Sequence, residues 1–383
     1  MYFITLTPMR SVLAISLLAA ASSLLIACGG GGSGLSAPAI TPPLATTLAA
    51  VPIRVVSTPN PNVFALLLAI ARQPALPVTL VPIGDGAQID SSFAAGQGDA
   101  LLAMTYTMAK KVNTGKVADL QLLRVNLWRG FSELALSSAA VTDFSQLIGK
   151  GLLVSGPTSG GKGGGPDLIF QAALRRAGRS IADFKICYLP VMQAAPMLAG
   201  QQKMNSNPAC DPSFDFAPTA ISLVEPAATG IVMQTLLPTS SGAAPLQRAI
   251  DFQALFTGYS AWPATQLPHG GLAVLGSVLG DPARQAALRS LLSAYDAAVA
   301  EIAAASPVQG MQIAQIVSAG ITKYYGNLGL ELPAPVIAAA LASKELVIRG
   351  DLGLAAVQPE LDRFLTEVVG AAPPAAFYRT QGF

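Results

Sequence analysis

The sequence predicts a two-lobe α/β fold. Short apolar runs alternate with helical stretches from residue 53 onward, which is the rhythm of β-α-β units and indicates a mainly parallel sheet flanked by helices. The rhythm restarts at Gly151, which indicates a second lobe, and from Pro282 the chain is mostly helical. About 330 residues follow the first 50, enough for two domains of ordinary size.

The expected elements follow the chain in order. In the first lobe they are a strand at 53–57, a helix at 62–72, a strand at 78–82, a strand closing the next unit at 98–104, and strands at 120–126 and 133–137. In the second lobe they are a strand at 152–155, a helix at 166–177, a strand at 184–188, a helix at 192–200 and a strand at 216–223.

The C-terminal third is expected to form helices that pack on a sheet already made. Asp281 followed by Pro282 is a typical helix start and begins a helix that runs to residue 304. Pro333 and Pro335 open another helix, and Pro359 opens a last one that ends near residue 369.

The N-terminus predicts export. Arg10 precedes a continuous apolar run that ends at Cys28, the pattern of a secretory signal peptide over residues 1–27. A transmembrane anchor is the alternative, although the run of about 17 residues is at the bottom of the spanning range. Residues 25–28, Leu-Ile-Ala-Cys, are similar to the bacterial lipobox, which implies a lipoprotein with lipid on Cys28. Residues 28–50 are rich in Gly, Pro and Ala and are expected to be a flexible tether.

Composition excludes several function classes. The net charge of +2 over 383 residues, with no basic patch, argues against nucleic acid as a partner. His269 is the only histidine and has no recognisable catalytic partners, and no metal-ligand spacing is present, so neither an enzyme nor a cofactor is expected. Cys187 and Cys210 form an even pair in an exported chain and are therefore candidates for a disulfide, with two buried free thiols as the alternative.

Four segments, taken in their order along the chain, carry a resemblance to a known family. They are the Gly98-Asp99-Ala element closing 93–100, the segment 142–154, the Glu225-Pro226 element, and the segment from Gly271 to Asp281. In this order they resemble the periplasmic substrate-binding proteins of ABC importers, in the nitrate, taurine, sulfonate and thiamine-precursor group.

The resemblance implies the type II periplasmic-binding-protein fold. Lobe I would comprise 51–147 plus 258–383 and lobe II 148–257, with hinge crossovers near 138–150 and 252–263. A monomeric protein of this kind captures a small molecule in the cleft between the lobes and presents it to an ABC permease, with no bond chemistry.

One departure from the family pattern concerns the cysteines. Residues 201–212 are inserted where the family turns at once, and Cys210 lies in that insert. A bridge to Cys187 would attach the insert to lobe II and stabilise the fold by roughly 3 kcal/mol in the chain-entropy model. We therefore predict the disulfide.

The glycine-rich segment 155–167 is the most distinctive local sequence. It nearly matches a nucleotide-binding P-loop, but Gly163 stands where a magnesium-binding hydroxyl is required, so nucleotide hydrolysis is not expected. Glycines allow close approach of a ligand to the backbone, and amides at a helix N-terminus favour anionic oxygens. The candidate ligand-binding residues here are Thr158, Ser159 and Gly160, with Lys162 as a charge partner; the alternative is a solvated loop.

Other candidates follow predicted strands, because open α/β sheets bind ligands at the carboxyl ends of their strands. They are Asn60, Asp85, Thr105 and Tyr106, for which ordinary turn chemistry is the alternative.

Further candidates lie near the expected crossings. Trp128 and Arg129 fall where the chain should cross between lobes, and packing of a hinge tryptophan is the alternative. Gln193 and Glu225 are weaker candidates, and Tyr259 with Trp262 could supply apolar walls. Few charged residues fall at predicted strand ends, which disfavours a highly charged ligand and allows an organic acid, a sulfonate or an aromatic metabolite.

Two further interpretations of the function remain open. The same fold could act as an envelope sensor or interaction lipoprotein without a permease. A thiamine-precursor enzyme is disfavoured, because its histidine and iron-binding residues are not recognisable. Gly29, where some lipoproteins carry Asp, resembles the outer-membrane sorting signal and would separate the protein from an inner-membrane permease.

Overall fold

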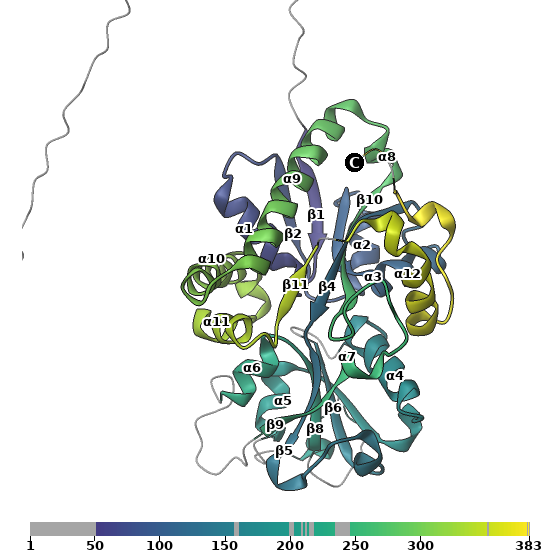
Figure 1. Cartoon of the computed structure of the whole chain (residues 1–383), viewed down its shortest axis with the longest axis vertical. Coiled ribbons are helices and arrows are strands. Elements are labelled where there is room, and N and C mark those ends of the chain that lie inside the picture. Colours follow the sequence, from purple (N-terminus) through teal and green to yellow (C-terminus); the bar gives the residue numbers. More distant parts are fainter. Residues whose placement is uncertain are drawn as a thin grey trace, which may run out of the picture. The chain divides into compact units, whose positions relative to one another are not determined.

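Two β-sheets carry the fold (Figure 1). The computed structural model describes residues 51–156, 161–198, 203–207, 210, 213, 218–233, 246–350, 352–380 and 382. The predicted signal peptide, the lipidation site Cys28 and the tether lie outside these residues.

The strand order differs from the order along the chain in both sheets. The first sheet is ordered β11-β4-β10-β3-β1-β2 and comprises β1 (Ile53–Ser57), β2 (Val78–Pro82), β3 (Ala100–Met104), β4 (Leu120–Arg129), β10 (Leu267–Leu275) and β11 (Val347–Arg349). The second is ordered β7-β6-β8-β5-β9 and comprises β5 (Phe131–Leu136), β6 (Gly151–Gly156), β7 (Lys185–Pro190), β8 (Pro218–Val224) and β9 (Leu246–Asp251). We call the body around the first sheet lobe I and the body around the second lobe II.

The prediction of a two-lobe α/β fold is confirmed, but the expectation of mainly parallel sheets is wrong, because both sheets are mixed. Parallel pairing is confined to β1 with β2 and β3, and to β6 with β7 and β8. The pairs β3-β10, β10-β4 and β4-β11 are antiparallel, as are β8-β5 and β5-β9. The reason is that β4 runs toward lobe II whereas β10 returns from it, so these two neighbours point in opposite directions.

Strand direction determines which edges of the two sheets face each other. β1, β2 and β3 are parallel and end at the edge where β4 also ends, since Trp128 near the end of β4 pairs with Leu267 at the start of β10. In lobe II, Val224 at the end of β8 pairs with Phe131 at the start of β5. The carboxyl ends of the parallel strands in each lobe therefore face the other lobe.

Helices cover both faces of both sheets (Figure 1). The helices of lobe I are α1 (Asn62–Arg72), α2 (Gln88–Ala94), α3 (Thr105–Asn113), α8 (Gly276–Leu279), α9 (Pro282–Ala304), α10 (Pro307–Tyr325), α11 (Ala334–Ala342) and α12 (Leu354–Val369). Those of lobe II are α4 (Gly165–Arg176), α5 (Val191–Leu198), α6 (Ala227–Val232) and α7 (Phe252–Leu255). Short 3₁₀ helices lie at Ser137–Ala139, Phe144–Leu147, Ile181–Asp183, Met204–Ser206, Gly326–Leu328 and Ala375–Phe377.

The packing divides each lobe into two faces. In lobe I, α1, α9 and α10 pack together on one face, and α3 with α12 covers the other. In lobe II, α5 and α6 contact one face, whereas α4 and α7 contact the other. One apolar cluster extends through lobe I and includes Phe170 and Phe252 of lobe II, and a second, smaller cluster lies under α5 and α6.

Helix starts follow local chemistry, with one correction. The Asp281 side chain accepts a hydrogen bond from Ala283 N (3.0 Å), and Pro282 occupies the first helical position of α9, as predicted. Pro359, expected to open the last helix, instead lies inside α12, which begins at Leu354. Its missing amide would have paired with the carbonyl of Ala355, and because both residues are exposed, water can satisfy that carbonyl.

The lobe boundary also differs from the expectation. The sequence placed residues up to 147 in lobe I, but β5 pairs with β8 and β9 of the second sheet, so the first crossing is at Gly130, between β4 and β5. A single glycine between two strands leaves no break in the strand pattern that would mark a boundary. The second crossing, between β9 and β10, includes the predicted 252–263 segment.

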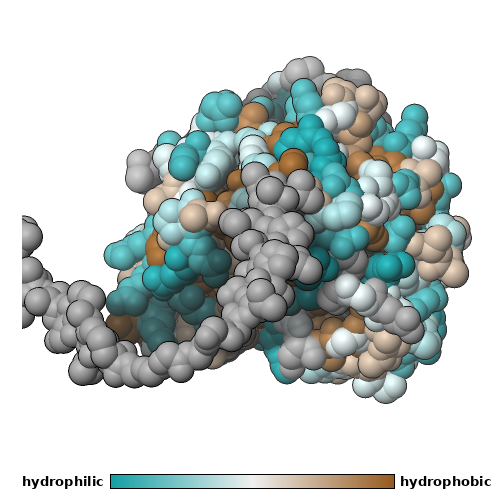
Figure 2. Space-filling view, turned by 90° about the horizontal axis from the view of Figure 1, so that it is seen from above, coloured by the Kyte–Doolittle hydropathy of each residue, from teal (hydrophilic) through white to brown (hydrophobic). Residues whose placement is uncertain are grey.

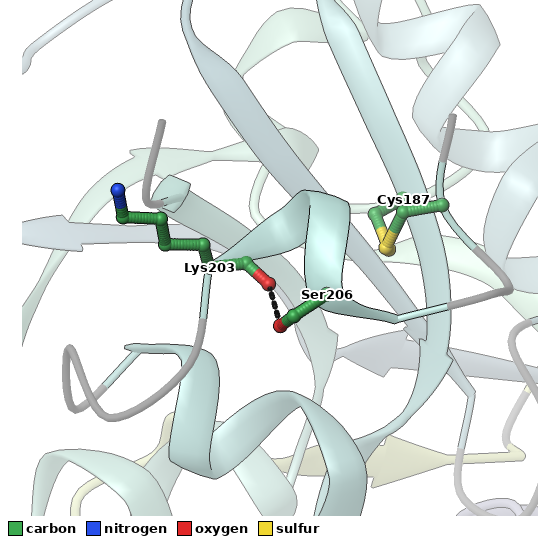
Figure 3. Close-up of a disulfide and its surroundings, with 4 residues drawn as sticks. Cys187, Lys203 and Ser206 are labelled. Atoms are coloured by element: carbon green, nitrogen blue, oxygen red, sulfur yellow. Dashed lines mark hydrogen bonds between the residues drawn. A yellow bond between two sulfur atoms is a disulfide. The ribbon is translucent and has the colours of Figure 1, made fainter. Parts of the chain in front are cut away.

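The disulfide prediction is confirmed. Cys187 of β7 and Cys210 are bonded, with a Cα–Cα distance of 4.7 Å and a sequence separation of 23. Figure 3 shows the bond beside the 3₁₀ helix Met204–Ser206, in which Ser206 Oγ donates to the Lys203 carbonyl (2.5 Å). The inserted segment is thus attached to an edge strand of lobe II.

The surface carries scattered apolar side chains. The exposed large hydrophobic residues are Val51, Ile148, Met233, Val308 and Met311. In Figure 2, hydrophobic areas on the visible face are small and interspersed with hydrophilic residues. Among the described helices, none combines the length and the apolar character needed to cross a membrane.

Candidate ligand-binding cleft

Adjoining cavities lie where the strand ends of the two lobes meet. An inner cavity of about 60 Å³ has walls from Asn60, Asp85 and Met104 of lobe I and from Gly156 and Val224 of lobe II. An outer cavity of about 650 Å³ shares Asp85, Gly86, Thr107, Gly161 and Gly164 with it and continues along α3. The second volume falls in the range of small-molecule sites. We call the two together the cleft.

Asn60 shapes the floor of the cleft. It is 5% exposed, and its side-chain amide donates to the Thr58 carbonyl (3.0 Å) and hydroxyl (2.9 Å). Its Oδ1 accepts from Asn62 N (2.9 Å) at the start of α1. The residue lines the inner cavity as predicted, but its polar atoms are occupied in holding the turn that follows β1.

Asp85 stands at the junction of the inner and outer cavities. Its Oδ1 accepts hydrogen bonds from Ala87 N (2.9 Å) and Gln88 N (3.1 Å), and Gln88 Oε1 accepts from Gly84 N (2.6 Å). These bonds satisfy free amides at the start of α2. The loop after β2 is thereby fixed at the mouth of the inner cavity.

The lobe II wall is the glycine run that leads into α4. Gly161 and Gly163 have φ of 73° and 71°, values that glycine adopts without strain. Asp167, in the first turn of α4 and 2% exposed, accepts from Gly163 N (2.7 Å), Gln171 Nε2 (2.9 Å) and Tyr188 Oη (2.9 Å). One amide expected to bind a ligand therefore already binds Asp167. Burial and the neighbouring Asp167 carboxylate raise the pKa of Tyr188.

The predicted loop residues Thr158, Ser159 and Gly160 lie outside the described residues. Lys162 is described and lines the outer cavity. Its ammonium lies 5.6 Å from the centre of the Tyr188 ring, a cation–π distance.

The two lobes touch directly in the cleft. Lys110 Nζ, from α3, donates to the Gly163 carbonyl of lobe II (2.8 Å). At Gly165, an added Cβ would lie 2.2 Å from Met104 Sδ and 3.0 Å from Thr107 Oγ1. A glycine is therefore needed for α4 to approach β3 and α3 this closely. We call this set of contacts the cleft seam.

The first crossing is held by a buried glutamine. Gln253, 1% exposed at the start of α7, accepts from Gly130 N and Phe131 N (both 3.0 Å) through its Oε1. Its Nε2 donates to the Phe131 carbonyl (2.7 Å). Both crossings therefore meet at one side chain.

Arg129 and Glu225 lie at the crossings in an ion-pair network. Arg129 pairs with Asp251 (3.2 Å) and Glu345 (3.7 Å), and Arg248 pairs with Glu225 (2.5 Å) and Glu345 (3.4 Å). Glu225 also accepts from Thr229 N (3.0 Å) at the start of α6. These side chains line a separate cavity of about 210 Å³, and Glu225 additionally borders a small pocket next to Asn60.

Trp128 and Tyr106 belong to a buried aromatic cluster and do not line the inner or outer cavity. The His269 ring centre lies 5.8 Å from that of Trp128, 5.9 Å from Tyr106, 4.9 Å from Phe131 and 6.3 Å from Phe364. Neither His269 nitrogen, nor Trp128 Nε1, has a hydrogen-bond partner within the described part of the chain. Burial lowers the pKa of His269 to about 3, so the ring is neutral.

The α4–α12 contact continues this cluster. The Arg176 guanidinium of α4 pairs with the Glu367 carboxylate of α12, with Nη2–Oε2 at 2.6 Å, and Tyr259 Oη donates to Glu367 (2.8 Å). Burial opposes ionisation of Glu367, but the hydrogen bonds from Arg176 and Tyr259 outweigh it and lower its pKa. Trp262 stacks on Tyr259 at 5.0 Å, so these two aromatics support the crossing. We call the aromatic cluster and this ion pair the hinge seam.

Two more predicted residues lie away from the cleft. Thr105 is fully buried, and its hydroxyl donates to the Pro268 carbonyl (2.5 Å). Gln193 is exposed on α5 and lines neither cavity of the cleft.

Sequence reasoning missed the lysines of the outer cavity. Lys110, Lys111 and Lys116 line it together with the predicted Lys162. Lys110 and Lys111 follow the end of β3 by about two helical turns. This position after a strand end is the feature of the sequence that could have predicted them near the cleft.

Comparison with known proteins gives similarity in structure only. No protein-family profile matches the sequence, and no curated protein matches it. Among solved structures, the periplasmic aliphatic sulphonate-binding protein of Escherichia coli is similar, with 16% identity, a TM-score of 0.53, and coverage of 84% of this chain and 89% of that one.

Two further structures are similar. The alkanesulfonate-binding protein of Xanthomonas axonopodis, bound to MOPS, has 15% identity and a TM-score of 0.55, covering 86% of this chain and 96% of that one. The ligand-binding component of an ABC-type import system from Staphylococcus aureus has 11% identity and a TM-score of 0.56, with the same coverages. The predicted resemblance to this group is thus confirmed at the level of the fold.

Proposed function

We propose that this chain is a substrate-binding protein that captures a small molecule in the cleft by closure of its lobes and delivers it to an ABC importer. The observation that carries the proposal is the inner cavity, whose walls come from the strand ends of both lobes. A ligand there contacts both walls only when the lobes are closed, so its binding energy favours the closed state. No bond chemistry is needed for this role.

Several features of the contact between the lobes support closure. The glycine at 165 lets α4 meet Met104 without a side chain between them, and Lys110 adds a single hydrogen bond across the cleft. The first crossing is the single residue Gly130, and both crossings meet at Gln253. A hinge of this kind allows rotation while keeping the strand ends aligned.

The cellular setting is part of the proposal. We infer that Cys28 is lipidated after export and that the tether holds the body near a membrane, facing the periplasm. Two of the similar solved structures are sulfonate-binding proteins, so sulfonates join organic acids and aromatic metabolites as the compounds to test first.

Ligand-induced thermal stabilisation tests the binding role. We expect at least one member of a panel of sulfonates, organic acids, phosphate esters, nitrate and pyrimidines to raise Tm by about 5 °C when present at 100 times its Kd. Gly165→Val, which places a side chain between α4 and Met104, should lose most of this shift. Gly310→Ala, where an added Cβ meets nothing within 4 Å, is the matched control and should keep it.

A folded, ligand-free protein that gains no stability from any compound in the panel would refute the binding role. The importer role would be refuted if the protein bound its ligand but cells lacking the protein still took up that ligand at the normal rate. That result would favour the sensor role. Membrane fractionation of Cys28→Ala checks the anchor, because the variant should move to the soluble fraction.

A further inference from the structure

Four of the nine lysines of the chain line the outer cavity. Lys110, Lys111 and Lys116 come from α3 and the turns after it in lobe I, whereas Lys162 comes from the glycine run of lobe II. In a chain with only 11% charged residues, this places nearly half of its lysines around one concave surface. The cavity is therefore the natural place to look for an anionic ligand.

The carboxylates near these lysines are already engaged. Asp90 pairs with Lys111 (2.6 Å), a lysine whose side chain is 15% exposed. Asp85 accepts two backbone hydrogen bonds at the start of α2, and Asp167 accepts from Gly163, Gln171 and Tyr188. Lys110, Lys116 and Lys162 thus face the cavity without a carboxylate partner in any ion pair of the described residues.

The positions of the cations set the charge of the ligand. Lys110 donates one hydrogen bond to Gly163, which leaves two of the three donors of its ammonium group. On the other lobe from Lys110, the Lys162 ammonium lies over the ring of Tyr188, and both of these residues belong to lobe II. Closure brings cations of the two lobes toward one another, and a bound anion that contacts both removes the repulsion between them.

We infer that the outer cavity binds the dianionic end of a small organic ligand, such as a phosphate monoester or a dicarboxylate, while its apolar part enters the inner cavity. The inference rests on the proposed binding role and deepens it. The inner cavity offers Met104, Ile89 and Val224 to an apolar segment, and the outer cavity offers lysines from both lobes to the two charges. This reverses the sequence expectation against a highly charged ligand, because the lysines come from α3 and the glycine run and not from strand ends.

Matched ligand pairs test the inference. Titration calorimetry on the full chain at pH 8 should show that the dianion of a matched pair binds at least about ten-fold more tightly than the monoanion. The pairs are succinate with butyrate and propyl phosphate with propanesulfonate. Each charge-assisted hydrogen bond lost is worth about this factor. Which of the two dianions binds tells a dicarboxylate site from a phosphate site, and binding by either supports the inference. Affinity for the dianion should also fall as NaCl is raised.

Lysine variants locate the charge recognition. Lys162→Gln and Lys116→Gln should each weaken dianion binding about ten-fold and weaken butyrate or propanesulfonate binding less, so the preference for the dianion should shrink. Lys150→Gln is the matched control, since this lysine is exposed on lobe II and lines neither cavity. All three are exposed positions, and equal Tm values in the absence of ligand confirm that the variants are folded.

The outcomes separate this inference from the binding role itself. Equal affinity for monoanion and dianion, or Lys162→Gln variants with an unchanged preference, would overturn the dianion inference. Binding of some other compound of the panel, with no dianion bound, would overturn it as well and leave the proposed binding role intact. If no compound binds at all, the binding role fails with it.

Discussion

The hinge seam and the cleft seam join the same two lobes with different chemistry. The hinge seam packs His269, Trp128, Phe131 and Phe364 at ring distances of 4.9–6.3 Å and adds the Arg176–Glu367 ion pair. The cleft seam has one lysine–carbonyl hydrogen bond and a glycine against Met104. The first is a continuation of the core, whereas the second borders cavities.

This difference indicates where the lobes would part in the proposed opening. The apolar cluster of lobe I includes residues of α4 and α7, so separating the lobes at the hinge seam would expose a core to water. Separating them at the cleft exposes glycines and lysines that water solvates well. We therefore expect opening to part the cleft seam while the hinge seam stays closed.

The largest effect is expected for Gly270→Ala. An added Cβ would lie 2.1 Å from Asn62 Oδ1 and 2.7 Å from Trp128 Nε1, both in fully buried side chains. Overpacking of this kind should lower the free energy of unfolding by about 3 kcal/mol, measured by urea denaturation. At Gly86, in the cleft, a Cβ meets nothing within 4 Å, and Gly86→Ala should change stability by less than about 0.5 kcal/mol. Equal losses in the two variants would contradict the asymmetry.

Acid should weaken the hinge seam through His269. Its pKa is about 3 in the folded protein because of burial, against an ordinary value of 6.5. Below pH 6.5 the His269 side chain takes up a proton in the unfolded chain but stays neutral in the folded chain. The free energy of unfolding is therefore highest above pH 6.5 and falls as the pH drops toward 3. The slope is about 1.4 kcal/mol per pH unit, or about 2 kcal/mol between pH 6.5 and 5.

The variant His269→Phe removes this titration and keeps an aromatic ring. Its free energy of unfolding should depend less on pH over the same interval, whatever its stability at neutral pH. Superimposable pH slopes for the variant and the parent protein would show that His269 is protonated or solvated in the folded state.

A smaller loss is expected from the ion pair of the hinge seam. Glu367→Gln removes the charge that Arg176 and Tyr259 share and should cost about 1.5 kcal/mol. The matched control is Glu301→Gln, which breaks a pair with Arg72 whose side chains are 49% and 36% exposed and should cost about 0.3 kcal/mol. Comparable shifts in Tm for the two variants would mean that the α4–α12 contact is an ordinary surface pair.

Much of the fold could be predicted because its signals are local. The bounds of β1, α1 and β2 follow from apolar periodicity, and α9 follows from its Asp-Pro start. The strands β9 and β11 could not be predicted in this way. β11 has only three residues, Val347–Arg349, and exists because it pairs with β4 more than two hundred residues earlier in the chain.

The site was predictable to the extent that topology places it. Asn60 and Asp85 follow parallel strands and reach the cleft by the strand-end rule. Thr105 and Tyr106 also follow a strand, but they begin α3, and the helix turns them into the core while Lys110 and Lys111 face the cavity. Which side of a helix faces a cleft depends on what packs against its other side. On that side of α3, Tyr106 contacts the rings of His269 and Phe364, and these come from distant parts of the sequence, so local patterns do not predict the orientation of the helix.

The smallest effect on stability is expected where the cleft seam is cut. Lys110→Ala removes the hydrogen bond to Gly163, which is exposed to solvent, so the free energy of unfolding should change by less than about 0.5 kcal/mol. The same change should shift the lobes toward the open state, because it removes the hydrogen bond of the cleft seam, and small-angle scattering should show a larger radius of gyration. Lys323→Ala, at an exposed position on α10, is the control for both measurements. A loss of stability as large as that of Glu367→Gln would mean that the cleft seam holds the lobes together as firmly as the hinge does. Opening of the cleft would then cost too much for a ligand to control.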